Sequence, residues 1–228
     1  MSKIVHPYAH RLVILRDWKS RWFADPKKYR ANLEGDVMIR EYLEKKLRGM
    51  YVSSVEIERN QKTTRFIIKT SRPGLIIGRS GEGATKLKED ILKKMKKLNL
   101  SKTEDFKLEV FEIANPEADA AIVAYMIAEG LEKRMPYRRV IKQVIEKVMA
   151  AQGVQGARIV LGGRLGGAEI ARTEELKRGS IPLQTFRADI DFKRERANLA
   201  YGLIGIKVWI YRGKIFAEKP NKQVNKSN

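Results

Sequence analysis

One short segment, residues 75–81 (LIIGRSG), constrains the fold of this 228-residue chain more than any other. Glycines three positions apart permit a sharp backbone turn, because a residue without a Cβ atom adopts positive φ at little cost. The apolar residues before the turn and the lysine-rich stretch 83–98 after it are typical of helices. The segment therefore predicts two helices joined by a glycine turn.

The residues around that turn predict an α+β unit. Asp36 is a suitable N-cap and Gly49 a suitable terminator for a helix over 36–49. Apolar and polar residues alternate, as they do in half-buried strands, around 55–58, 65–69 and 106–113. The resulting order over residues 36–115 is helix, strand, strand, helix, helix, strand.

A second α+β unit begins at Asn115-Pro116. We expect two helices, over 117–134 and 136–151, packed on a mostly antiparallel sheet with strands near 157–161, 183–193 and 203–212. The predicted organisation is an N-terminal basic arm (1–35), the first domain (36–115), a C-terminal α+β domain (116–213) and a polar tail (214–228).

The charge of the chain points to a polyanionic partner. Lysine and arginine total 47 against 27 acidic residues, a net charge of +20. RNA or DNA is favoured over a membrane surface, because the charge is spread along the chain and does not flank one hydrophobic anchor.

The chain has no cysteine, which excludes disulfides and finger-type zinc sites. No apolar run is long enough to span a bilayer, residues 1–7 do not resemble a secretory signal, and we expect no cofactor or small-molecule substrate.

The glycine turn itself is a candidate RNA site. Gly78 and Gly81 leave room for a phosphate backbone, the following helix start offers amide donors, and Arg79 adds a forked cation beside Ser80. This pattern resembles the GXXG loop of K-homology (KH) domains, which holds a short single strand. The alternative is an ordinary turn between helices, but the preceding strands and the basic helix favour RNA binding.

Residues 133–142 form a second candidate, with five basic residues and no acid. At about 100° per residue, Arg138, Arg139 and Lys142 share one helix face, and the aliphatic residues face the other way. Lys133 and Arg134 precede them. A solvated helix face is the alternative, but the local absence of acids favours RNA contact.

Further RNA-contact candidates lie in the arm and in a glycine-rich basic loop over 162–178. They are Lys3, His6, Arg11, Lys19 and Arg21 in the arm and Arg164, Arg172 and Arg178 in the loop. The loop matches neither a Walker nor a dinucleotide-binding pattern, and we expect Glu174 and Glu175 to pair with basic neighbours. Trp18 and Trp22 either stack on bases or anchor the arm, and anchoring is favoured.

Asp189 and Asp191 offer an enzymatic alternative. Two carboxylates on one strand can hold magnesium for nucleic-acid hydrolysis, but outward-facing charges on a strand explain them equally well. No catalytic residue and no metal site are therefore predicted.

The whole chain over about 1–213 resembles the family of the third protein of the bacterial small ribosomal subunit. Its start (KIVHP, 3–7), its RPG (72–74) before the glycine turn and a long stretch over 163–174 (GRLGGAEIARTE) are similar to that family. Residues 183–191 and 201–210 (YGLIGIKVWI) complete the resemblance.

That resemblance implies a type II KH domain and a structural protein of the cytoplasmic ribosome, not an enzyme. It also implies a place in the subunit head, contact with small-subunit rRNA and mRNA, and neighbours that include the fourth, fifth, tenth and fourteenth proteins. The helix with Arg138, Arg139 and Lys142 would face incoming mRNA at the entrance tunnel and assist its unwinding. A free KH-type regulatory factor is the alternative.

Overall fold

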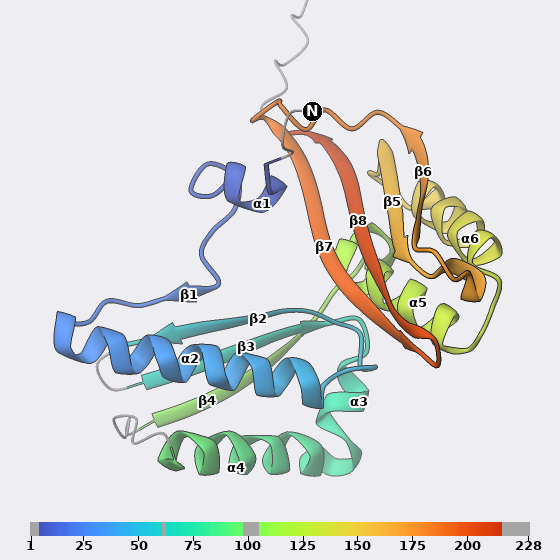
Figure 1. Cartoon of the computed structure of the whole chain (residues 1–228). Helices are drawn as coiled ribbons and strands as arrows, with labels where there is room; N and C mark the ends of the chain where they lie inside the picture. Colours follow the sequence, from blue (N-terminus) through green and yellow to red (C-terminus); the bar gives the residue numbers. More distant parts are fainter. Residues whose placement is uncertain (1–4, 61–62, 98–104, 216–228) are drawn as a thin grey trace, which may run out of the picture.

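The computed structural model describes residues 5–60, 63–97 and 105–215, which form two α+β units and an N-terminal arm that contacts both (Figure 1). The first unit has the predicted order of helices and strands. Its elements are α2 (Pro26–Lys46), β2 (Val52–Arg59), β3 (Thr63–Thr70), α3 (Pro73–Ile77), α4 (Glu82–Lys97) and β4 (Asp105–Glu112). The α+β prediction and the KH order of elements are confirmed.

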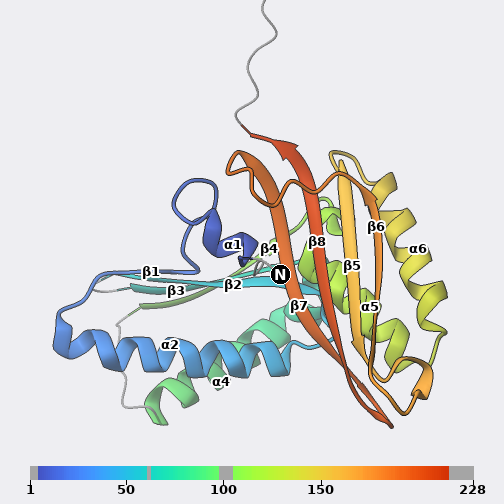
Figure 2. The same ribbon diagram turned by 45° about the horizontal axis from the view of Figure 1, so that its top comes forward.

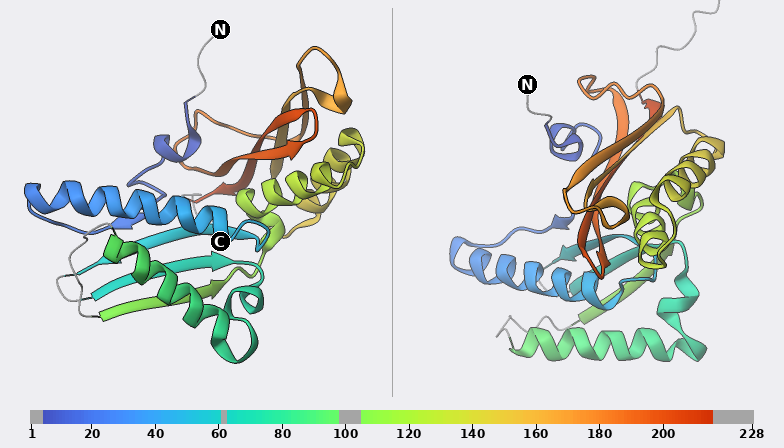
Figure 3. Two further views of the ribbon diagram at one scale, coloured as in Figure 1. Left: turned by 60° about the horizontal axis from the view of Figure 1, so that its bottom comes forward. Right: turned by 45° about the vertical axis from the view of Figure 1, so that its right-hand side comes forward.

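The sheet of the first unit has the order β1-β2-β3-β4, with β1 (Ser20–Arg21) supplied by the arm. Strands β2 and β3 are antiparallel, whereas β3 and β4 are parallel. Helices α2 and α4 cover one face of this sheet (Figure 3). Leu43, Phe66 and Ile91 are completely buried between the helices and the sheet, as the alternating strand pattern predicts.

Helix α2 begins ten residues earlier than the predicted helix over 36–49. Pro26 occupies its first turn, where a missing N–H costs nothing, and the helix ends before Leu47. The predicted boundary at residue 35 therefore falls inside α2. Asp36 is not an N-cap, and the N-cap assignment is wrong because Asp36 lies within the helix and faces the sheet.

Asp36 is a buried acid held by two partners. Its side chain is 1% exposed. Its Oδ1 accepts a hydrogen bond from Arg59 Nε at 2.9 Å, and its Oδ2 accepts one from Trp22 Nε1 at 2.7 Å. The contact anchors Trp22 of the arm, as expected, whereas Trp18 is 58% exposed and is not anchored in this way. The cluster ties the arm, α2 and β2 together.

The second unit contains a four-stranded sheet of order β6-β5-β8-β7, antiparallel throughout. The prediction of two helices on a mostly antiparallel sheet is confirmed, and Figure 2 shows α5 and α6 together on one side of the sheet. The elements are α5 (Ala120–Glu132), α6 (Tyr137–Ala150), β5 (Gly156–Gly163), β6 (Arg172–Gly179), β7 (Ala188–Leu199) and β8 (Gly202–Lys214).

Two features of this sheet differ from the prediction. Residues 172–179 form strand β6, an edge strand paired with β5, and are not part of a loop. The polar composition of β6 hid its alternation, because an edge strand buries little of its surface. The strand expected over 183–193 starts at Ala188, since residues 181–187 run across the sheet end as irregular backbone.

The arm is fastened to the second unit by Arg11, which follows the short helix α1 (Pro7–His10). Arg11 is completely buried. Its guanidinium donates hydrogen bonds to the carbonyl oxygens of Ala188 at 2.6 Å, Leu183 at 2.9 Å and Thr185 at 2.9 Å. Because β1 of the same arm extends the KH sheet, the arm connects the two units (Figure 1).

Parts of two predictions lie outside the described residues: Lys3, and the polar tail from residue 216 on. Within the described residues, no helix combines the length and apolar character needed to cross a membrane.

Removing the Asp36 carboxylate should strongly destabilise the fold. In Asp36→Ala, the Arg59 guanidinium stays buried without its counter-charge, a loss of about 3–5 kcal/mol in the free energy of unfolding. Urea denaturation measures the change. The double variant Asp36→Leu/Arg59→Met should recover most of the loss, since no buried charge remains.

Lys86→Ala, which breaks an exposed pair with Glu82, is the control and should shift stability by less than about 0.5 kcal/mol. Equal effects of Asp36→Ala and Lys86→Ala would contradict this assignment.

Candidate RNA-binding surfaces

The glycine turn joins α3 to α4 as predicted. Gly78 ends α3 at φ +71° and donates its amide to the Gly74 carbonyl at 2.9 Å. Residues Arg79–Gly81 form a short 3-10 turn in which Gly81 has φ +82° and Ser80 has φ +52°. A Cβ atom on Gly78 would lie 3.1 Å from the Gly83 nitrogen. Both the positive φ and the close approach therefore require glycine at this position.

Gly83, which the sequence analysis did not single out, is needed for the same turn. A Cβ atom there would lie 2.6 Å from the Ile76 carbonyl oxygen and 3.0 Å from that of Ile77. The first turn of α4 is thus packed directly on the backbone of α3. The signal in the sequence is the third glycine of GRSGEG (78–83), at a helix start where glycine is otherwise unfavourable.

The surface of the turn combines a cation with apolar side chains. Arg79 and Ser80 are exposed, and Arg79 forms no ion pair with any residue that the structure describes. Leu75 is 54% exposed and Ile77 39% exposed beside them. An open backbone, a free guanidinium and adjacent apolar surface suit a single strand, whose phosphates and bases need these two kinds of contact.

Replacing Gly83 with alanine should damage both stability and RNA binding. The added Cβ must push α4 away from α3, which costs about 1–3 kcal/mol. The displaced turn should bind a short single-stranded RNA more weakly than the parent chain. Urea denaturation and fluorescence anisotropy measure the two effects. Glu82→Ala, at the exposed neighbouring position, is the control. A Gly83→Ala protein with parental stability and affinity would show that the close packing is unimportant.

Helix α6 presents the predicted basic face. Val140, Ile141 and Ile145 are buried against the sheet, whereas Arg139 and Lys142 are exposed. Neither exposed residue has an ion-pair partner in the described part of the chain. The aliphatic side fixes the helix, so the cations are held on a rigid support with their charge directed to solvent.

Arg138 shares that face but already has a partner. Its Nη2 lies 3.2 Å from Glu174 Oε1, and Tyr137 donates its hydroxyl to the same oxygen at 3.3 Å. Glu175 likewise pairs with Arg158 at 2.7 Å. The prediction that the two glutamates form ion pairs is confirmed. Arg138 is 73% exposed, so solvent screens the contact and the guanidinium remains accessible.

The turn between α5 and α6 carries the other two residues predicted for this surface. Lys133 pairs with Glu129 at 2.6 Å on the exposed surface of α5. Arg134 is exposed and has φ +60°, a left-handed conformation that ends the turn after the helix. Both residues therefore lie at the start of the α6 surface.

The remaining basic candidates of the second unit differ in their surroundings. Arg164 is exposed but donates to the carbonyl oxygens of Ala168 at 2.9 Å and Tyr201 at 3.4 Å. Arg172 is exposed at the start of β6 and has no ion-pair partner among the described residues. Arg178 pairs with Glu146 of α6 at 3.3 Å. Arg172 is thus the least engaged of the three.

Arg11 requires a correction. It was predicted to contact rRNA, but it is inaccessible and its donors are used by backbone carbonyls. This arginine serves the fold instead, because a buried guanidinium must have its donors satisfied.

The other arm candidates remain accessible to different degrees. Arg21 contacts Asp17, Glu56 and Glu58, and these acids raise the pKa of its guanidinium, chiefly through the hydrogen bond to Glu58. Lys19 is exposed as a residue. Its ammonium group is nevertheless surrounded by protein atoms that displace water, and this desolvation lowers its pKa. Partial burial lowers the pKa of His6, and Arg194 acts in the same direction.

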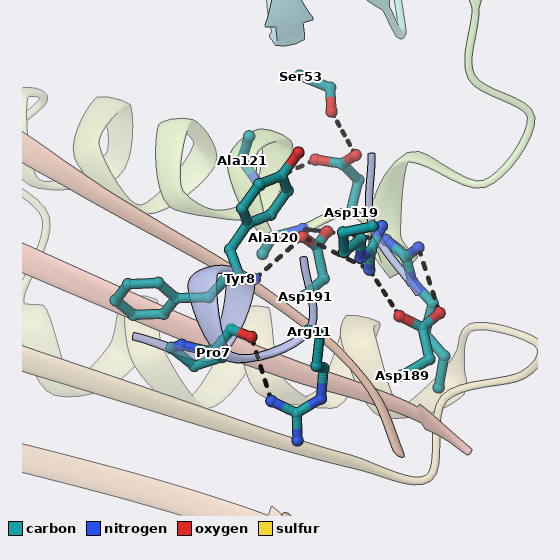
Figure 4. Close-up of polar contacts among 12 residues, drawn as sticks. Pro7, Tyr8, Arg11, Ser53, Asp119, Ala120, Ala121, Asp189 and Asp191 are labelled. Atoms are coloured by element: carbon teal, nitrogen blue, oxygen red, sulfur yellow. Dashed lines mark hydrogen bonds and ion pairs between the residues drawn. The ribbon is translucent and has the colours of Figure 1, made fainter. Parts of the chain in front are cut away.

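Asp189 and Asp191 are occupied by guanidinium groups. Asp189 lies 2.6 Å from Arg16 Nη2, and Asp191 accepts from Arg212 Nη2 at 2.8 Å. Asp191 also accepts the Ala120 amide at 3.0 Å at the start of α5, near the N-cap Asp119 (Figure 4). Burial raises the pKa of Asp119, and repulsion by Asp191 adds to the effect. These contacts fasten the arm, β7, β8 and α5 together, which explains both aspartates without hydrolytic chemistry.

The structure does not combine these basic groups into one site. The glycine turn lies at one end of the KH unit, whereas α6 lies on the far side of the second unit (Figure 1). The arm lies beside β7, on the opposite side of the C-terminal sheet from α6 (Figure 2). The chain therefore offers separate surfaces to separate stretches of polyanion.

The fold and these surfaces define a class of protein, the KH-domain RNA-binding proteins. Residues 38–118 match the family model of the KH domain, and residues 127–210 match that of "Ribosomal protein S3, C-terminal domain". Three relatives called "Small ribosomal subunit protein uS3" extend the match to nearly the whole chain. They come from Maridesulfovibrio salexigens (47% identity over 94% of this chain and 97% of the relative), Coxiella burnetii strain RSA 493 (42%; 98% and 95%) and Clostridium novyi (41%; 96% and 96%).

The chain belongs to the family of small ribosomal subunit protein uS3. The family resemblance predicted from the sequence is thereby confirmed.

Proposed function

We propose that this chain is a structural, RNA-binding constituent of the small ribosomal subunit, that it lines the tunnel through which mRNA enters, and that α6 assists mRNA unwinding there. Its relatives carry a ribosomal protein's name over nearly their full length, and that family is structural, not enzymatic. The chain accordingly works in the cytoplasm as part of the ribosome.

The observation that carries the mRNA proposal is a pair of exposed cations on a well-packed helix, neither of which forms an ion pair with any described residue. Arg139 and Lys142 are one turn apart on α6. Side chains at i and i+3 are neighbours on a helix, about 5–6 Å apart at Cβ. Arg138 extends the same face. Such a row can hold successive phosphates of a single strand, and these contacts are independent of sequence.

Unwinding at this surface would need no chemistry from the chain. Translocation pulls mRNA through the particle, and cations at the entrance bind the strand that has been released from a hairpin. Binding the single strand lowers its free energy relative to the paired form, so the hairpin reopens more easily and closes less often. The fixed helix makes this effect available without a conformational change.

The same proposal places the chain in the subunit head beside the fourth, fifth, tenth and fourteenth small-subunit proteins. Contacts with rRNA would come from the glycine turn around Arg79 and from Arg172, whose charges are free in the described part of the chain. Lys19 and His6 would add contacts from the arm, since both are exposed.

The well-formed glycine turn also fits a free KH-type regulatory factor, the second candidate. The two functions differ in where the protein is found. A structural constituent should travel with small subunits in a sucrose gradient of cell lysate at both low and high salt. A free factor would stay near the top of the gradient at both salt concentrations while still binding short single strands, and that result would reject the ribosomal proposal.

Charge reversal on α6 tests the mRNA proposal. Arg138→Glu/Arg139→Glu/Lys142→Glu should leave the fold intact, because all three side chains are exposed. At 0.1 M salt, each lost phosphate contact weakens single-strand binding about fivefold. Translation through a stable mRNA hairpin should therefore slow by about tenfold or more in a reconstituted system, while an unstructured message is translated normally.

The control carries the same charge change on exposed lysines outside α6, at Lys93, Lys96 and Lys107. It should pass the hairpin at the parental rate. If the α6 variant also passes the hairpin at that rate, α6 does not assist unwinding.

A further inference from the structure

Helices α5 and α6 cover only one face of the C-terminal sheet, and the opposite face is partly open (Figure 2). The strand registers define which residues lie side by side on this open face. Across β6, β5, β8 and β7, the first row is Thr173, Gly162, Gly205 and Arg196 and the second is Glu175, Val160, Lys207 and Arg194. We call these two rows the open face.

The arm closes one end of this face. The next row of the sheet ends with Trp209 and Phe192, which pack with Ile190 and Tyr211 beneath residues 181–187. The His6 ring meets Phe192 edge-on, with ring centroids 4.8 Å apart. The hydrophobic contacts that fasten the arm therefore stop at Phe192, and the open face begins beyond it.

Three cations of the open face form no ion pair within the described residues, although acids line the same depression. Arg194, Arg196 and Lys207 are exposed, and none of them pairs with an acid in the part of the chain that the structure describes. Lys207 and Arg194 are cross-strand neighbours, and Arg196 is two residues further along β7. Like charges this close repel one another, and the repulsion raises the free energy of the unbound chain. A bound polyanion would remove this repulsion.

Two glycines form the floor beside these cations. Gly162 and Gly205 are paired across β5 and β8, and neither has a positive φ. A Cβ atom on Gly205 would lie 3.7 Å from the nearest atom, the Gly162 oxygen, and one on Gly162 would lie 3.8 Å from Thr173 Oγ1. The fold therefore has room for larger residues at both positions. Glycine inside a strand weakens it by roughly 0.5–1 kcal/mol, so its presence here favours close approach of another molecule.

The glycines lie in a depression of about 710 Å³ between the open face and α2. Six basic and three acidic side chains line it, so its net charge is positive. Its rim includes Arg194, Arg196 and Lys207, together with Lys45 of α2. Val160 is half-buried, and the other residues of the two rows are glycine, polar or charged. Leu203, two residues before Gly205 on the same side of β8, is 58% exposed. A protein partner normally buries a cluster of apolar residues, and two separated side chains beside a row of cations make a small one.

We propose that the open face binds the ribose-phosphate backbone of an RNA strand, with one nucleotide over Gly162 and Gly205 and phosphates held by Arg196, Lys207 and Arg194. This inference rests on the proposed role of the chain as a ribosomal RNA-binding protein. It adds a surface distinct from the glycine turn and from α6. Residues two apart on a strand are about 7 Å apart, which lets Arg194 and Arg196 contact neighbouring phosphates.

Neutralising the three cations tests whether their charges hold the phosphates of an RNA strand. Arg194→Gln/Arg196→Gln/Lys207→Gln should fold normally, because it relieves repulsion on an exposed surface. RNA binding by the full chain should weaken on the order of 10–100-fold at 0.1 M salt, and the slope of log K against log salt should fall by about 2. The control, Lys93→Gln/Lys96→Gln/Lys107→Gln, has the same net charge, and its salt slope should fall by less than a third as much.

A larger side chain at Gly205 tests whether an RNA strand approaches the backbone of the open face closely. Gly205→Val places a β-branched side chain in a strand position with room for it, so the melting temperature should stay the same or rise. RNA affinity should nevertheless fall at least severalfold, with the salt slope unchanged. Parental affinity in both Gly205→Val and the triple variant would overturn the proposal, as would a triple variant no weaker than its control.

Cross-linking in assembled subunits identifies the bound strand. Cross-links from Lys207 to rRNA that persist without mRNA assign the face to rRNA, and cross-links that require mRNA assign it to the message. Cross-links to protein alone would overturn the proposal. The hairpin assay on α6 separates this inference from the proposed function. If the open-face variants bind RNA like the parent chain, only the open-face proposal is rejected and the proposed role of α6 stands. If the chain never joins small subunits, both proposals are rejected.

Discussion

The buried guanidinium of Arg11 is the contact on which the arrangement of the two domains depends. It lies under the segment before β7 and satisfies three carbonyl groups there. Ten residues later, the same arm joins the KH sheet as β1. A guanidinium can serve this purpose because it has five donors in a fixed plane, and irregular backbone leaves carbonyls that need partners. Together with the Arg16–Asp189 ion pair, this contact fixes the course of the arm between the units.

Several partly or fully buried acids position arginines of the framework. Asp36 holds Arg59, and Asp189 and Asp191 hold Arg16 and Arg212. With 27 acids for 47 basic residues, the chain has more cations than its acids can pair one to one. Several cations that form no ion pair within the described residues lie on rigid supports: a glycine turn, the outer side of α6 and the open face of the C-terminal sheet. The surplus charge is thus displayed in separate places, which suits a protein that contacts a folded RNA at several points.

Much of the KH unit and of its candidate site could be predicted from local patterns. Alternation in β2 and β3 and the glycine spacing of 78–81 are both short-range signals, and local geometry determines them. The basic face of α6 was likewise predictable, because helical periodicity separates Arg139 and Lys142 from the buried aliphatic residues. Strand β6 escaped prediction because its pairing with β5, and not its own composition, makes it a strand.

The class of fold, the surplus of positive charge and the residues of the glycine turn and of α6 all follow from patterns within the sequence. Which of the described cations are exposed and without an ion pair depends on how the chain packs. Arg11 and Arg79 look alike in a sequence, yet one is completely buried and the other exposed. The open face is a tertiary feature too, since Gly162 and Gly205 become neighbours only when β5 pairs with β8. The physical reason is that burial and ion pairing depend on contacts between residues far apart in the chain, and no local pattern records those contacts.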